Sequence, residues 1–145
     1  MNERKPNERK KEQKKSFLLR EISTLVHALG REEPDVAAVF ITRVELSADN
    51  GICYIYFAAY PDPKVEDFKA AAQAMFNKAL DRLKLYKPSM RTALAKVMHG
   101  KYTPSLIFLF DEKQEKVLKI NELLDKVQTS LDDYDEQHPE EQEQA

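Results

Sequence analysis

The sequence predicts an α+β domain with the order helix, strand, strand, helix, helix, strand, followed by an extra helix near the C-terminal end. Three observations favour this class. Apolar residues recur at helical spacing over 17–29 and 65–83, β-branched residues alternate on either side of an Asn-Gly turn, and residues 106–110 read LIFLF. We expect a three-stranded sheet with the helices packed on one face. The 145 residues are enough for one domain.

The first helix is expected to begin at Ser16. A serine suits the N-cap, and Gly30 suits the left-handed position that ends a helix. Between them the apolar residues share one helical face, and Pro34 ends the pattern. The apolar face consists of Phe17, Leu18, Ile22, Leu25, Val26 and Leu29.

Two strands follow this helix. Residues 36–46 and 52–59 alternate and are rich in β-branched and aromatic side chains. Asn50 and Gly51 lie between them and tolerate positive φ, which predicts an antiparallel hairpin. Two prolines in residues 60–63 then favour a loop.

The next segment predicts two helices that meet at a sharp junction. Residues 65–83 form an amphipathic helix with a basic exposed face. The residue before a proline avoids helical dihedral angles, so Lys87 marks a break before Pro88. A second helix then begins near Pro88 and runs to His99. We therefore expect the two helices to meet at a sharp break at Lys87 and Pro88.

The last part of the domain is expected to supply the third strand and a final helix. The run LIFLF over 106–110 is typical of a strand in the centre of a sheet, and Asp111 ends it. Apolar residues at helical spacing over 117–131 then predict one more helix.

The net charge is -2, but the basic and acidic residues are unevenly distributed along the chain. Residues 1–15 carry seven basic and three acidic side chains, and residues 132–145 carry seven acidic and no basic ones. Such segments bury too little apolar surface to offset the entropy of ordering. We expect a basic disordered arm at 1–15, a folded domain at 16–131 and an acidic disordered tail at 132–145. Within the domain, residues 64–101 hold nine basic and three acidic residues.

Composition excludes several classes of site. Cys53 is the single cysteine, and three glycines leave no Gly-rich loop for a nucleotide phosphate. We expect no cofactor, no metal and no catalytic centre, because no nucleophile, base or carboxylate pair is assembled. No apolar run approaches the roughly 18 residues that span a bilayer, and the first residues lack the apolar region of a signal peptide. A cytoplasmic protein without membrane contact is therefore expected.

The basic middle of the chain is the candidate binding site. Cations near the predicted helix junction would attract phosphate, and few acidic residues accompany them. The alternative is a solvated helix face that only keeps the domain soluble. The expected RNA contacts are Lys78, Arg82, Lys84, Lys87, Arg91, Lys96 and Lys101.

Other candidate residues favour packing over chemistry. Tyr54 and Tyr56 share one strand face and would either stack on bases or pack in the sheet, and we favour packing. His27 is expected to pack beside an apolar neighbour. His99 would either contact phosphate or interact with the C-terminal end of the helix through the helix dipole.

The order of elements matches the type II KH domain, although the chain has no GxxG loop. Its residues resemble bacterial ribosome-binding factor A more specifically, over about residues 16–127. The family pattern is a T-x-V-x-x-S-x-D turn, an R-x-x-L helix, a P-x-L-x-F-x-x-D strand and an I-x-x-L-L helix. The matching residues are Thr42, Val44, Ser47, Asp49, Arg91, Leu94, Pro104, Leu106, Phe108, Asp111, Ile120, Leu123 and Leu124.

This resemblance implies a KH type II fold in which A-x-G kinks the central helices. In this chain the aligned triplet is Tyr86-Lys87-Pro88. The resemblance also implies a monomer that binds the 30S subunit and 16S rRNA, assists late maturation and 5′-end processing of 16S rRNA, and supports growth in the cold. It implies no catalytic activity.

Two alternatives remain beside this interpretation. One is a general KH-type RNA-binding or translation-regulating protein without a ribosomal target, and the other is a protein-only module that uses the apolar C-terminal helix. The acidic tail also has two interpretations. It is either an inert solvated end or a segment that folds back on the basic helices and weakens nonspecific RNA binding.

Overall fold

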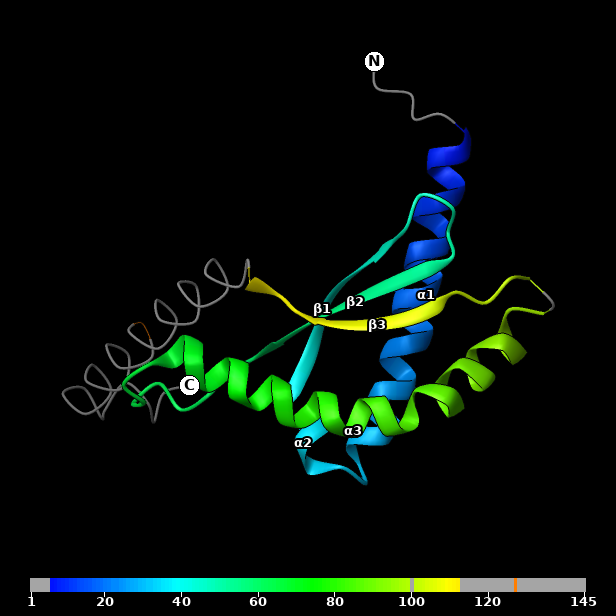
Figure 1. Cartoon of the computed structure of the whole chain (residues 1–145). Helices are drawn as coiled ribbons and strands as arrows, with labels where there is room; N and C mark the ends of the chain where they lie inside the picture. The colour runs from blue at the N-terminus through cyan, green and yellow to red at the C-terminus, as the bar shows by residue number, and fades with distance from the viewer. Residues whose placement is uncertain (1–5, 100, 113–126, 128–145) are drawn as a thin grey trace, which may run out of the picture. The chain divides into compact units, whose positions relative to one another are not determined.

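The computed structural model describes residues 6–99, 101–112 and 127 (Figure 1). The helix expected at 117–131 falls outside these residues except for residue 127, and the acidic tail lies wholly outside them. No helix in the described ranges is long and apolar enough to cross a membrane. The elements are α1 (Pro6–Gly30), α2 (Pro34–Ala37), β1 (Val39–Leu46), β2 (Ile52–Ala59), α3 (Phe68–Val97) and β3 (Ser105–Phe110).

The three strands form one mixed sheet in the order β1-β2-β3. β1 pairs antiparallel with β2, and β3 pairs parallel with β2, so β2 is central. The hairpin turn follows from its residues: Asn50 has φ 59, and the Asp49 carboxylate accepts hydrogen bonds from the Ser47 hydroxyl and the Gly51 amide. The amide hydrogen bond lowers the pKa of Asp49. The predicted α+β class and three-stranded sheet are confirmed.

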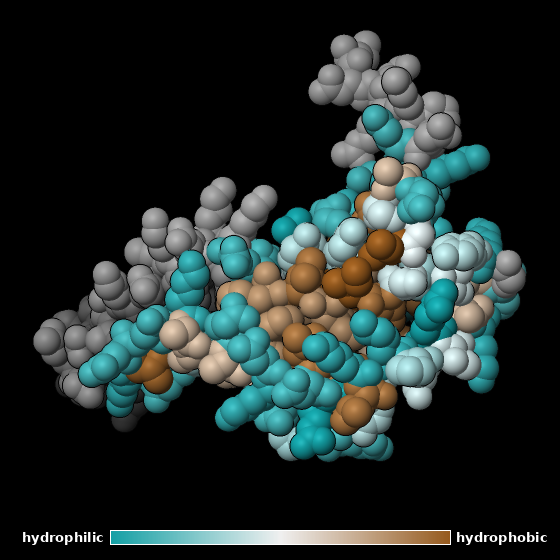
Figure 2. Space-filling view, in the orientation of Figure 1, coloured by the Kyte–Doolittle hydropathy of each residue, from teal (hydrophilic) through white to brown (hydrophobic). Residues whose placement is uncertain are grey.

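The core lies between one face of the sheet and the two long helices. Alternate residues of β2 point into it, and Phe57 packs against Phe76 of α3 and Phe108 of β3 with ring centroids 6.1 and 5.9 Å apart. Leu18 and Ile22 of α1 are fully buried in the same cluster. Figure 2 shows apolar side chains at the centre of one face, surrounded by hydrophilic ones.

Helix α1 begins at Pro6, ten residues before the expected start at Ser16. The prediction of a disordered arm was therefore wrong for residues 6–15. Tertiary contacts hold this extension, because the Lys11 ammonium donates to the Ser47 carbonyl at 3.2 Å and the Lys15 ammonium lies 3.0 Å from Glu45. The hydrogen bond to Glu45 raises the pKa of Lys15.

The expected sharp junction is also corrected, because α3 continues through Pro88 without ending. Proline removes one backbone hydrogen bond, and the Thr92 hydroxyl donates to the Pro88 carbonyl at 3.0 Å, a contact that bends helices. The ribbon of α3 changes direction within its second half (Figure 1). Leu83 and Leu94 are fully buried on either side of Pro88, so core packing keeps both segments in one helix. The short helix α2 was also missed, since the first strand was expected from residue 36.

Cys53 gives a prediction about the rigidity of this core. The thiol is fully buried, and burial raises its pKa from 9.0 to about 11. Ellman's reagent is therefore expected to leave the folded chain almost unmodified at pH 8 and to react fully once urea unfolds it. Because the unfolded thiol ionises first, the free energy of unfolding should fall by up to about 2 kcal/mol as pH rises from 9 toward 11. Rapid stoichiometric reaction in native buffer would contradict this burial.

Candidate nucleic-acid interface

Helix α3 carries six of the seven predicted contact residues, and its continuity divides them into two groups. At about 100° per residue, Lys84, Lys87 and Arg91 project on one side of the helix, which we call the β3 flank. The other three project roughly 160° away, and we call their side the opposite flank. It consists of Lys78, Arg82 and Lys96. The sequence-predicted set is therefore two surfaces rather than one cluster.

The β3 flank lies along the edge of the sheet. The Lys87 ammonium is 5.3 Å from the centre of the Phe108 ring, and the Arg91 guanidinium donates to the Thr103 carbonyl at 3.1 Å. Lys101 is exposed in the segment between α3 and β3. In the described part of the chain, none of these cations forms an ion pair with a carboxylate. Their charge is available to a bound anion.

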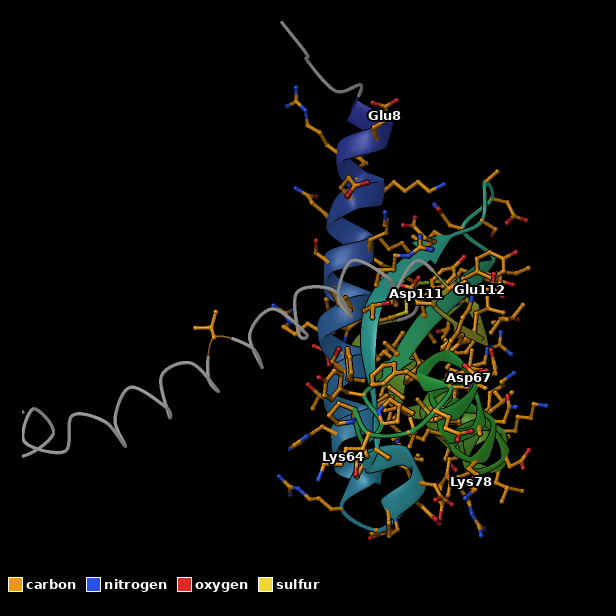
Figure 3. The ribbon with its side chains drawn as sticks, turned by 90° about the vertical axis from the view of Figure 1, so that its left-hand side faces the viewer. Glu8, Lys64, Asp67, Lys78, Asp111 and Glu112 are labelled. Carbon is orange, nitrogen blue, oxygen red and sulfur yellow. The ribbon has the colours of Figure 1, made fainter. Side chains whose placement is uncertain are left out.

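The opposite flank is partly neutralised by the residues before α2. The Arg82 guanidinium lies 3.7 Å from the Glu33 carboxylate, which also accepts a hydrogen bond from the Tyr86 hydroxyl at 2.9 Å. This hydrogen bond raises the pKa of Tyr86. Lys78 is exposed and extends from α3 away from the sheet (Figure 3). The predicted kink residues Tyr86 and Lys87 therefore face different partners.

Sequence reasoning missed one residue that lies next to the β3 flank. Tyr102 is 65% exposed and lines a shallow depression with Arg91 and Pro88. An exposed aromatic ring beside cations is a platform on which a nucleic-acid base can stack. The signal in the sequence was a tyrosine directly after Lys101, between the predicted helix that ends at His99 and the predicted strand at 106–110. The remaining residues of the depression are Thr92, Ala95 and Thr103.

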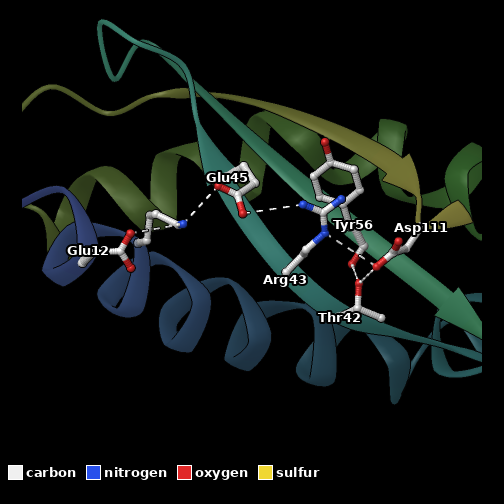
Figure 4. Close-up of polar contacts among 7 residues, drawn as sticks. Glu12, Thr42, Arg43, Glu45, Tyr56 and Asp111 are labelled. Carbon is white, nitrogen blue, oxygen red and sulfur yellow. Dashed lines mark hydrogen bonds and ion pairs between the residues drawn. The ribbon is translucent and has the colours of Figure 1, made fainter. Parts of the chain in front are cut away.

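The other sheet face is a packed polar cluster (Figure 4). The Arg43 guanidinium lies 3.8 Å from the centre of the Tyr56 ring, so this ring is covered and the packing interpretation of Tyr56 is confirmed. The register of β1 shifts between Ile41 and Arg43. The Thr42 hydroxyl between them donates to the Asp111 carboxylate at 2.6 Å. Two residues of the family pattern, 69 positions apart, thus tie β1 to the end of β3.

The described residues gather no group of three or more histidine, cysteine or acidic side chains able to hold a metal ion. His27 is exposed on α1, so its expected packing role is corrected. His99 follows the C-cap residue Met98 and has φ 50, which is the helix-end position that favours glycine. Cys53 is a buried strand residue.

The fold and these surfaces define a class: a small α+β domain whose longest helix presents cations along the edge of a mixed sheet. The chain belongs to the ribosome-binding factor A family, whose family model matches residues 10–124. This range includes the part of α1 that lies just before Ser16.

Relatives and a solved structure agree with this membership. Ribosome-binding factor A of Pelobacter propionicus is 30% identical over 89% of this chain and 98% of its own length. The Trichlorobacter lovleyi protein is 32% identical over 79% of this chain and 84% of its own length. The crystal structure of ribosome-binding factor A from Thermus thermophilus covers 69% of this chain and 93% of that one, with a TM-score of 0.54 and 23% identity, which shows a shared fold.

Proposed function

We propose that this chain is an assembly factor that binds the immature 30S subunit through 16S rRNA. It assists late maturation of the subunit, including processing of the 5′ end of 16S rRNA. It acts by binding, as a cytoplasmic monomer without a catalytic centre. Family membership supports the ribosomal target.

The observation that carries the RNA contact is the β3 flank. From Arg82 to Lys101 the chain holds six lysines and arginines and no acidic residue. Three of these cations lie on the β3 flank, and one of them, Arg91, lines a depression with exposed Tyr102. Phosphate binding by such a surface releases counterions, so affinity should fall steeply with salt.

Sucrose-gradient sedimentation of the full chain with ribosomal particles tests the proposal. The chain should migrate with free 30S particles in preference to 70S ribosomes. Cells depleted of the protein should accumulate 16S rRNA with an unprocessed 5′ end. Absence from every ribosomal fraction at physiological salt would refute the ribosomal target.

The alternative is a general KH-type RNA-binding or translation-regulating protein without a ribosomal target. It shares the basic surface but predicts a different set of bound RNAs. Sequencing of RNA cross-linked to the chain in cells separates the two. Reads concentrated on 16S rRNA support the assembly factor, whereas reads dominated by messenger RNA support the alternative.

A further inference from the structure

A second basic groove lies between the first turns of α1 and the C-terminal end of α3. Its volume is about 710 Å³, within the range of roughly 300–1,000 Å³ typical of ligand sites. The groove is distinct from the depression beside Pro88, since the two share no lining residue. Its lining consists of Lys10, Gln13, Lys14, Phe17, Val97, Met98, His99 and Lys101.

The lysines of α1 form two stripes with different partners. Lys11 and Lys15 are spaced four residues apart and bind the hairpin through Ser47 and Glu45. Lys10 and Lys14 have the same spacing on the neighbouring face and line the groove. Neither of them forms an ion pair within the described part of the chain. The first stripe anchors the helix, and the second is left for a ligand.

The floor of the groove is apolar. Phe17 is half-buried and continues the stripe of Lys10 and Lys14 one turn further on. The Arg20 guanidinium lies 5.7 Å from the centre of the Phe17 ring, farther than Arg43 lies from the Tyr56 ring. Val97 is 38% exposed. At the rim, His99 follows the C-cap of α3 and holds the left-handed φ of 50 that ends this helix. Cations around an aromatic floor are the arrangement by which proteins hold single-stranded nucleic acid.

We infer that this groove binds a single-stranded segment of RNA. Lys10, Lys14 and Lys101 contact its phosphates, and the ring of Phe17 stacks on a base. The inference rests on the proposed function, which brings RNA to the neighbouring β3 flank. Lys101 lines the groove and lies one residue before Tyr102 of the depression, so one strand can pass from one site to the other.

Salt-dependent binding of a fluorescent single-stranded oligouridylate by the full chain tests the groove. Replacing Lys10 and Lys14 together with alanine removes two phosphate contacts. The plot of log affinity against log salt should become flatter by about 1.4, which is about 0.7 for each contact. Phe17→Leu keeps the apolar floor but removes the ring, and it should lower affinity about fivefold or more, while binding to an RNA duplex changes little.

The matched control replaces Arg9 and Arg31 with alanine. Arg9 near the start of α1 and Arg31 directly after its end are both exposed and do not line the groove, and replacing them removes the same charge. An equal change in slope for both double variants overturns the inference. Tighter binding of a polyglutamate peptide than of oligouridylate also overturns it, because the groove would then serve an acidic protein segment.

The two claims fail separately. If the wild-type chain sediments with 30S particles but Lys10 and Lys14 do not affect the slope, the groove is refuted and the proposed function stands. If the slope changes as expected but the chain does not sediment with 30S particles, the ribosomal target is refuted and the groove stands.

Discussion

Alanine at Lys84, Lys87 and Arg91 together should lower the affinity of the chain for 30S particles about 10- to 150-fold at physiological salt. These three cations form the β3 flank and have no carboxylate partner within the described residues. An exposed charge pair contributes up to about 1 kcal/mol, so three phosphate contacts contribute about 1.5–3 kcal/mol. The dependence of log affinity on log salt should flatten by about 3.

The matched control is alanine at Lys78, Arg82 and Lys96. This triple variant removes the same charge from the same helix, but on the opposite flank, where Arg82 already pairs with Glu33. Its affinity should fall less than about threefold, the effect of general charge alone. Equal losses for both triple variants would mean that α3 attracts RNA without a preferred side. Urea unfolding of both variants measures their stability. Equal stabilities show that a lower affinity does not come from the loss of the contacts that Arg91 and Lys87 make with Thr103 and Phe108.

Asp111→Ala should lower the free energy of unfolding by about 2–4 kcal/mol. Asp111 is 7% exposed, accepts the Thr42 hydroxyl at 2.6 Å and lies 3.7 Å from the Arg43 guanidinium. Hydrogen bonds to a charged group contribute about 1.5–3 kcal/mol, and a group left buried without its partner adds to the loss. Urea denaturation measures the change.

Asp111→Asn is the matched control, because the amide keeps the shape and still accepts the Thr42 proton. It should cost clearly less than alanine. A double-mutant cycle with Thr42→Val isolates the pair, and we expect an interaction energy of about 1–2 kcal/mol. An interaction energy near zero would mean that the 2.6 Å hydrogen bond does not hold the two strands together.

The sheet was predictable because its signals are local. Residues 52–59 were predicted as a strand and form β2 with those bounds, since buried and half-buried residues alternate over 52–57 as the pleat requires. The Asn50-Gly51 turn likewise follows from residues that accept positive φ or need no side chain. Local signals fail where contacts with residues far away in the sequence determine the structure of a segment. The first turns of α1 carry so many charged residues that the sequence predicts disorder there. They are nevertheless helical, because Lys11 and Lys15 contact Ser47 and Glu45 of the hairpin, about 30 residues further along the chain.

The sequence predicted which cations belong to the candidate site but not how they are arranged around α3. The rule that proline ends a helix placed a junction at Pro88, and the cations around a junction would form one cluster. Burial of Leu83 and Leu94 outweighs the lost backbone hydrogen bond and keeps α3 continuous. In a continuous helix, the positions of Lys78 and Arg82 place them on one flank, and the position of Lys84 places it on the other.

Hydroxyl-radical probing from a single tethered site tests the central claim, that the β3 flank faces 16S rRNA. Ala95 is exposed and lines the depression with Tyr102, so Ala95→Cys carries the probe there, and Ala28→Cys places it on exposed α1 surface. Buried Cys53 stays unlabelled. On 30S particles, the probe at residue 95 should cut 16S rRNA at defined sites and the probe at residue 28 should not. Strong cutting from residue 28 with none from residue 95 would contradict the account.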